Sequence, residues 1–161
     1  MATLTIEVDS IRVQHLLKRL SNECSISGIA DTLKEIGGDL VYSTKQRFIT
    51  GKAPDGTTWQ GLSDVTKNLR ARRGRFGTRP LDDTGTMKTN VSYRLTEDGL
   101  VVGVNRRFGP HADAGVHQTG TDRAGRGHKV TIPARPFLGL SETDINGIEI
   151  TIVRAIQGNT P

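Results

Sequence analysis

Hydrophobic and polar residues form regular patterns along the first part of the chain. Apolar residues alternate with polar ones over residues 4–8, which predicts a strand, and recur at helical spacing over residues 13–20. A longer stripe at helical spacing spans residues 26–50. Gly37 and Gly38 lie inside this stripe, where each costs about 1 kcal/mol relative to alanine. We therefore expect another chain segment to approach the helix backbone closely at both glycines.

The later part of the chain predicts a hairpin, two further short strands and a last helix. Alternating residues over 91–104 surround an Asp-Gly turn and form the clearest hairpin in the sequence. Within a loop-rich region we expect a short strand over residues 114–118, and another follows over 130–132. Residues 141–144 have the Ser-x-x-Asp spacing of a capping box that starts the last helix. The β-branched residues of 148–153 leave a strand as an alternative there.

Residues 51–80, called the arm below, lack sustained periodicity. Ser63 is placed to cap a short helix over residues 64–69, and Thr84 is placed to cap a brief helix through Met87. Segments longer than about 12–15 residues without structure of their own are usually functional or disordered. We therefore expect the arm to be mobile and to become ordered on assembly.

Together these elements predict an α+β fold in a single domain, residues 1–161. Helices are expected to pack on one face of a small antiparallel sheet, with the long basic arm between the long helix and the sheet. The chain is long enough to bury a core, although only 34% of its residues are hydrophobic and 19 are glycine. We therefore expect a modest hydrophobic core and additional stability from contacts with partner subunits.

The formal net charge of +5 comes from one part of the arm. Six of the 22 basic residues fall within residues 67–79 with no acidic residue among them, and the remaining 16 are balanced by 17 acidic residues. Three interpretations stay open: contact with an acidic patch on a neighbouring protein, which we favour, contact with nucleic acid, or a solvated loop. The six are Lys67, Arg70, Arg72, Arg73, Arg75 and Arg79.

Export and membrane insertion are not expected from this sequence. The single Cys24 cannot form an intrachain disulfide, which fits a cytosolic, reducing history. The N-terminus lacks the pattern of a signal peptide, and no stretch approaches the roughly 20 apolar residues of a membrane span. We expect a soluble protein that is not exported by itself.

No cofactor, metal or catalytic residue is expected either. The i, i+2, i+6 spacing of His111, Asp113 and His117 does not place them on one side of a strand or helix turn, and no cysteine is near enough to complete a zinc site. No nucleophile is singled out that would pair with His117 as a base. We expect His117 and Gln118 to hold a turn by hydrogen bonds, with Gly120 supplying an unusual backbone angle.

Two prolines make one segment near the C-terminus stiff. Pro133 and Pro136 bracket Ala134 and Arg135, and each proline fixes its own φ and biases the preceding residue toward extended geometry. The result is a rigid bracket that presents one arginine and one aromatic, Phe137. Arg135 is the best candidate for a structural ion pair or an intersubunit contact, and Phe137 is expected to bury against the long helix.

Five short segments with recognisable spacing follow one another along about residues 40–157. They are Pro54-Asp55-Gly56 with Trp59 and Leu62, Leu81 with Thr84-Gly85 and Met87, Gly99 to Asn105, His117-Gln118-Thr119-Gly120, and Ile132 to Ser141 with Asp144. In this order they resemble the phage virion morphogenesis family, a family of tail-completion proteins that includes the G protein of Mu-like phages. Five ordered matches are more specific than any one of them.

The resemblance implies a structural protein of the bacteriophage virion and not an enzyme. We expect it to act in tail completion and in head–tail joining, as a subunit of a hexameric ring at the tail–neck junction. Its partners would be copies of itself, tail-tube and neck or connector proteins, and packaged DNA, with no membrane. Assembly would occur in the host cytoplasm. The alternative is a nucleic-acid-binding module that uses residues 67–79, and the motifs do not separate tail completion from tail termination or a connector role.

Two groups of side chains are predicted to carry this function. Contacts with a partner or a neighbouring subunit are expected from Arg70, Arg72, Arg73, Arg75, Phe76, Arg79 and Arg135. Structural anchors are expected at Trp59, Gly85, His117, Gln118, Pro133, Pro136 and Phe137.

Overall fold

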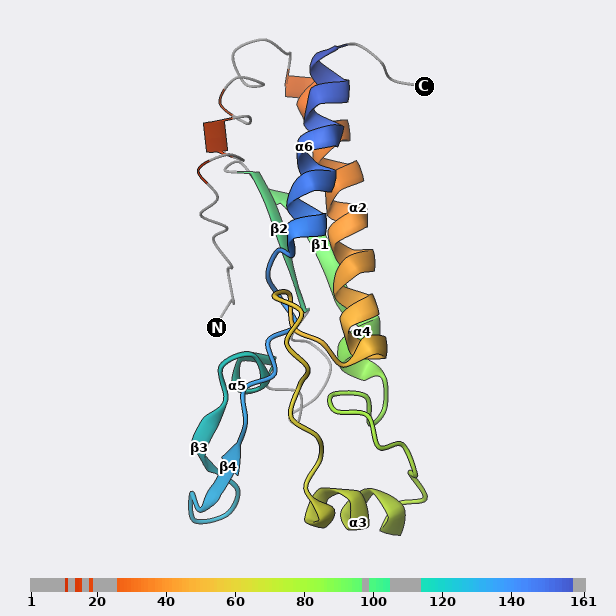
Figure 1. The fold of residues 1–161 in the computed structure, drawn as a ribbon, viewed down its shortest axis with the longest axis vertical. Coiled ribbons are helices and arrows are strands. Elements are labelled where there is room, and N and C mark those ends of the chain that lie inside the picture. The colour runs from red at the N-terminus through yellow and green to blue at the C-terminus, as the bar shows by residue number, and fades with distance from the viewer. Residues whose placement is uncertain are drawn as a thin grey trace. The chain divides into compact units, whose positions relative to one another are not determined.

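The fold is α+β, as the sequence predicts, with several helices and two small antiparallel sheets (Figure 1). The computed structural model describes residues 11, 14, 15, 18, 26–96, 99–104 and 114–157. The predicted strand over 4–8 and most of the helix predicted over 13–20 lie outside them, although residues 14, 15 and 18 are helical. No helix among the described residues is both long and apolar enough to cross a membrane.

The described residues group into two compact units. The first unit comprises the chain up to Ser43 together with Ser92–Gly103 and Gly139–Pro161. The second comprises Thr44–Val91 and Val104–Leu138. Both the arm and the proline-bracketed segment belong to the second unit.

Two helices and a hairpin supply most of the first unit. They are α2 (Ile26–Thr50), α6 (Glu142–Ile156), and the paired strands β1 (Val91–Thr96) and β2 (Gly99–Val104). The end of α2, from Thr44 on, belongs to the second unit. The long helix and the hairpin therefore form where the hydrophobic pattern predicts them. Within this unit α6 lies alongside α2 (Figure 1).

A complete capping box starts α6. The Ser141 hydroxyl accepts a hydrogen bond from the Asp144 N–H at 3.2 Å, and the Asp144 carboxylate accepts one from the Ser141 N–H at 2.8 Å. Both bonds satisfy N–H groups that a helix start would otherwise leave unpaired. Residues 148–153, for which a strand was the alternative, are helical.

The core of the first unit is a small isoleucine cluster. Ile36 of α2 is buried against Ile148 and Ile152 of α6, and Leu100 of β2 packs against this cluster. Because Ile148 and Ile152 are four residues apart, they lie on the same face of α6. Burial of each such side chain stabilises the fold by about 1.5–3 kcal/mol.

The hairpin approaches α2 at one of the two glycines within that helix. A Cβ atom placed on Gly37 would lie 2.6 Å from two ring carbons of Tyr93 and 3.0 Å from a methyl carbon of Leu100. The predicted close approach is therefore confirmed at Gly37. The same prediction is wrong for Gly38, because a Cβ atom placed there would have nothing within 4 Å.

The second unit holds short elements joined by turns. They are α3 (Asp64–Arg72), α4 (Thr86–Thr89), α5 (Ala114–Thr119) and the strands β3 (Thr121–Ala124) and β4 (Val130–Ile132). Strands β3 and β4 pair antiparallel, so the strand predicted over 130–132 is confirmed and gains a partner that the sequence did not predict. In place of the single sheet that the sequence predicts, the chain therefore forms two separate two-stranded sheets.

The strand predicted over residues 114–118 is wrong, because these residues form α5. The Gly120 N–H donates to the Val116 carbonyl at 2.7 Å, and the Thr119 hydroxyl donates to the Gly115 carbonyl at 3.0 Å. The first is the backbone bond from residue i to residue i−4 of an α-helix, and the second is a side-chain bond to the carbonyl four residues earlier, which a helical backbone brings within reach. Gly120, with φ of +75°, ends the helix, and the strand begins after it.

The first part of the arm is a tight turn followed by a buried tryptophan. The Ala53 N–H donates to the Thr57 carbonyl at 2.8 Å, which closes a turn over Pro54, Asp55 and Gly56. Gly56 has φ of +85°, a conformation that glycine adopts without strain. The turn returns the chain toward the end of α2, where the Trp59 N–H donates to the Gly51 carbonyl at 2.8 Å.

The two short helices of the second unit form near their predicted positions. The Ser63 hydroxyl accepts from the Thr66 N–H at 3.3 Å and caps α3 as predicted, and the helix extends beyond residue 69. The residue that precedes α4 is Gly85, with φ of +72°, and not Thr84. The Thr84 hydroxyl accepts a long bond of 3.4 Å from the Thr86 N–H and shares a bond of 2.7 Å with the Thr86 hydroxyl. Ordering of the arm on assembly stays a prediction.

The adjacent glycines of α2 provide a matched test of the core of the first unit. Gly37→Ala is expected to lower the free energy of unfolding by about 1–3 kcal/mol, because its methyl group overpacks against Tyr93 and Leu100. Gly38→Ala is expected to raise it by up to about 1 kcal/mol through helix propensity. Urea unfolding followed by circular dichroism measures both, and equal effects at the two positions would contradict the close approach.

Candidate functional site

The backbone of residues 136–138 is held by side chains from distant parts of the sequence. The Gln118 Oε1 atom accepts from the Phe137 N–H at 3.0 Å and from the Leu138 N–H at 3.1 Å. Its Nε2 atom donates to the Leu138 carbonyl at 2.8 Å. One side-chain amide therefore satisfies three backbone groups that have no strand partner.

Two further side chains complete this set of bonds. The Arg47 Nη1 atom donates to the Phe137 carbonyl at 2.9 Å, and the Trp59 Nε1 atom donates to the Pro136 carbonyl at 2.8 Å. Arg47 and Trp59 are both buried. Backbone carbonyls in such surroundings would cost free energy without a partner. We call Gln118, Arg47, Trp59 and the backbone that they hold the bracket site.

An aromatic cluster packs beneath the bracket site. The ring centroids of Phe48 and Phe137 are 5.2 Å apart, and those of Phe48 and Trp59 are 5.8 Å apart with an interplanar angle of 79°. Phe48 and Phe137 are fully buried. Pairs of this kind contribute about 0.5–1.5 kcal/mol beyond the burial of area. The predicted burial of Phe137 against the long helix is thereby confirmed through Phe48 of α2.

Arg135 is buried and turned toward the arm. Its Nε atom donates to the Gln60 carbonyl at 2.8 Å and its Nη2 atom donates to the Gly61 carbonyl at 3.0 Å. Burial, and in second place the charge of Arg70, lowers the pKa of the Arg135 guanidinium. The ion pair predicted for Arg135 is not found among the described residues, since carbonyl oxygens take the place of a carboxylate.

Gly120 is required by the close passage of the proline-bracketed segment. A Cβ atom on Gly120 would lie 2.7 Å from the Ala134 nitrogen and 3.0 Å from the Ile132 carbonyl oxygen. The Arg135 N–H also donates to the His117 carbonyl at 2.7 Å. The His-Gln-x-Gly segment therefore fastens residues 132–138 through both its backbone and its Gln118 side chain.

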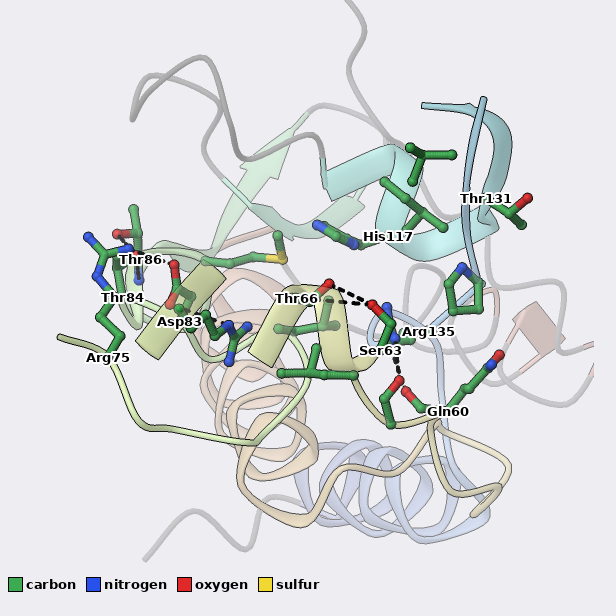
Figure 2. Close-up of a pocket in the computed structure, with 18 of the residues that line it drawn as sticks. Gln60, Ser63, Thr66, Arg75, Asp83, Thr84, Thr86, His117, Thr131 and Arg135 are labelled. Atoms are coloured by element: carbon green, nitrogen blue, oxygen red, sulfur yellow. Dashed lines mark hydrogen bonds and ion pairs between the residues drawn. The ribbon is translucent and has the colours of Figure 1, made fainter. Parts of the chain in front are cut away.

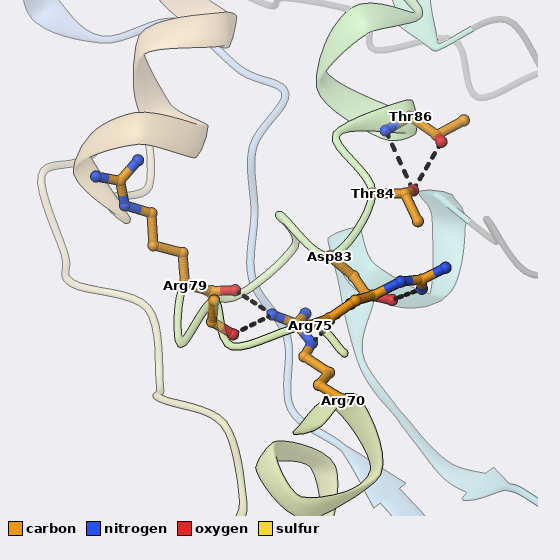
Figure 3. A network of polar contacts seen from close by, with 7 residues as sticks. Arg70, Arg75, Arg79, Asp83, Thr84 and Thr86 are labelled. Atoms are coloured by element: carbon orange, nitrogen blue, oxygen red, sulfur yellow. Dashed lines mark hydrogen bonds and ion pairs between the residues drawn. The ribbon is translucent and has the colours of Figure 1, made fainter. Parts of the chain in front are cut away.

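Arg70 organises the basic half of the arm (Figure 3). Its Nη1 atom donates to the carbonyls of Gly77 and Arg79 at 3.1 and 2.9 Å, and its Nε atom pairs with Asp83 at 3.3 Å. The other oxygen of Asp83 accepts from Arg75 at 2.6 Å. The Arg70 side chain is buried and holds the arm's own backbone. Its predicted contact with a partner stays a prediction.

Other side chains of the arm face solvent. Phe76 is 80% exposed, and Val65 and Leu69, four residues apart on α3, are 69% and 48% exposed. Exposed arginines accompany them, and their predicted contacts with a partner stay a prediction. These arginines are Arg72, Arg73, Arg75 and Arg79.

A pocket of about 940 Å³ lies within the second unit, between the arm and β4 (Figure 2). Its positive lining comes from Arg70, Arg73, Arg75 and Arg135. Hydroxyl groups line it as well, from Ser63, Thr66, Thr84, Thr86 and Thr131. His117 and the apolar residues Leu62, Met87 and Pro133 also line the pocket.

No group of three or more His, Cys, Asp or Glu side chains gathers as metal ligands in the part of the chain that the structure describes. His111 and Asp113 lie outside that part, so the prediction about their spacing has no structural counterpart here. His117 lies instead in the wall of the pocket, beside hydroxyl and guanidinium groups.

Sequence reasoning missed two side chains that hold the site. Arg47 lies one residue before Phe48 in the last turn of α2, and a basic residue there signals only a favourable helix end. Asp83 is one of the first acidic residues after the basic run. This closeness in sequence could have predicted its pairing with Arg70.

Removal of the Gln118 side chain tests the bracket site. Gln118→Ala is expected to lower the free energy of unfolding by about 2–3 kcal/mol, because it leaves three backbone groups without partners. The control Gln60→Ala removes an exposed side chain and leaves the carbonyl that Arg135 contacts, so it should cost less than about 0.5 kcal/mol. Denaturant unfolding measures both, and similar losses would contradict the assignment.

Comparison with known proteins identifies the family of this chain. Residues 8–157 match the model of the phage virion morphogenesis family. The chain is 30% identical over 155 residues to Mu-like prophage FluMu G protein 2 of Haemophilus influenzae, which covers 96% of this chain and 94% of that protein. It is 28% identical over 151 residues to tail completion protein S of Escherichia phage P2, which covers 91% and 96% respectively. No solved structure matches it significantly. The chain therefore belongs to the phage virion morphogenesis family.

Proposed function

We propose that this morphogenesis protein completes the phage tail and joins it to the neck, as one subunit of a hexameric ring. Membership of the family and similarity to a protein named for tail completion support a role in the virion. On this proposal the work is done by binding free energy, with no chemical step and no enzyme activity. Its partners are copies of itself and the neighbouring tail-tube and neck proteins, and assembly takes place in the host cytoplasm.

The observation that carries the proposal is the combination of a firmly held base and an exposed arm. Trp59 and Arg135 fasten the start of the arm to the bracket site, while Phe76, Val65 and Leu69 expose large apolar surfaces. Aromatic residues and arginine are enriched at protein interfaces, and exposed apolar patches commonly mark such sites. An arm of this kind suits contact with a neighbouring subunit.

A second candidate function follows from the same exposed side chains. Arg72, Arg73 and Arg79 beside Phe76 would suit single-stranded or duplex nucleic acid, through phosphate pairing and stacking. Salt dependence separates the two functions, because binding that depends on phosphate contacts weakens steeply as salt rises.

Head–tail joining in extracts tests the proposed function directly. Separate head and tail fractions prepared without the protein should give intact particles only after the purified protein is added. Phe76→Asp is expected to lower the yield about tenfold or more, since it places a charge where an aromatic contact is proposed. Ile150→Asp, at an exposed position of α6, is the control and should act like wild type. Particles that join firmly without the protein would end the proposal.

A further inference from the structure

The pocket between the arm and β4 carries more positive charge than its own residues neutralise. Four arginines line it, and Asp83 is the one carboxylate among the described lining residues. Two of these arginines, Arg70 and Arg135, are 9% and 6% exposed. Burial of a charged group costs free energy unless an opposite charge or hydrogen bonds compensate for it.

The ion pairs and hydrogen bonds within the pocket neutralise only part of that positive charge. Asp83 already pairs with both Arg70 and Arg75. Arg135 donates to two carbonyl oxygens, which accept hydrogen bonds but carry no net charge. The lowered pKa of the Arg135 guanidinium, caused first by burial and then by the charge of Arg70, is a consequence of the same imbalance. An anionic occupant would relieve it.

The rest of the lining favours a peptide as that occupant. Thr131 and one hydroxyl of the hydrogen-bonded pair Ser63 and Thr66 can donate to carboxylate oxygens, and Figure 2 shows all three side chains around the pocket. Leu62 and Met87 add apolar surface that would contact aliphatic side chains. Guanidinium groups bind carboxylates and phosphates alike with bidentate geometry, so the apolar part of the lining, and not the arginines, is what favours a peptide over a DNA backbone.

We propose that this pocket binds an acidic segment of a neighbouring virion protein, with carboxylate side chains beside aliphatic ones. The inference rests on the proposed function, because that function places other virion proteins next to the arm. The acidic side chains would sit against Arg135 and Arg73, and the aliphatic ones against Leu62 and Met87. The arm would then contribute both its exposed apolar side chains and this pocket to the contact.

Fluorescence anisotropy on the purified protein tests the pocket without any phage particle. The probe is a labelled short peptide of glutamate, leucine and glycine, compared with the same peptide carrying glutamine for glutamate and with a labelled DNA duplex. Wild-type protein is expected to bind the glutamate peptide at least tenfold more tightly than the glutamine peptide, because each charge-assisted bond to a carboxylate is strong.

Two variants with matched controls locate the binding. Arg73→Glu is expected to weaken binding about tenfold, while Arg126→Glu, at an exposed position between β3 and β4 and outside the pocket lining, should change it less than about threefold. Thr131→Trp narrows the pocket without altering its charge and should weaken binding about tenfold, whereas Asn68→Trp, at an exposed neutral position of α3 outside the lining, should not.

Each contrary outcome overturns the proposal. Equal loss from Arg126→Glu and Arg73→Glu, or full binding by Thr131→Trp, would show that the peptide binds the general basic surface and not the pocket. Preference for the DNA duplex would favour the nucleic-acid function, and equal affinity for the two peptides would show that carboxylates are not recognised. If heads and tails join without the protein, the proposed function is wrong, whatever the pocket binds. Failure of the pocket proposal and failure of the proposed function are therefore distinguishable.

Discussion

The Gln118 side chain does for residues 137 and 138 what a neighbouring strand would do in a sheet. Its amide accepts from two backbone N–H groups and donates to one carbonyl. Pro136 has no N–H to offer a strand, so this segment cannot complete a regular ladder. Side chains must satisfy its buried backbone, and Arg47 and Trp59 supply the remaining bonds. The aromatic cluster of Phe48, Trp59 and Phe137 is placed by the same bonds.

The position of the arm follows from this site. Trp59 and the carbonyls of Gln60 and Gly61 tie the arm's first part to the proline-bracketed segment. Farther along, Arg70 ties Gly77 and Arg79 to α3, and Asp83 shares its carboxylate between Arg70 and Arg75. A basic segment that composition alone would leave as a flexible loop thus acquires a defined backbone. Its exposed residues are presented from a fixed base.

Sequence reasoning found the elements that depend on local chemistry. The periodicity of α2, the cap at Ser63 and the capping box at Ser141 are encoded by neighbouring residues, and each forms where it was predicted. The resemblance to the family identified Gln118 and Trp59, although not what they contact. Residues 114–118 were misassigned because a short segment has no reliable period, and a helix bond from Gly120 decided its conformation. The inward turn of Arg70 depends on Asp83 and two carbonyls, and charge counting cannot reveal it.

The most direct test of the structural role is the mass of the protein in solution and on tails. Light scattering of the purified 17.5 kDa chain, followed by quantification of the copies that sediment with purified tails, gives both values. The account predicts a monomer in free solution that adds to each tail as a fixed small number of copies, six for the proposed ring. A monomer that ignores tails and binds duplex DNA would contradict it.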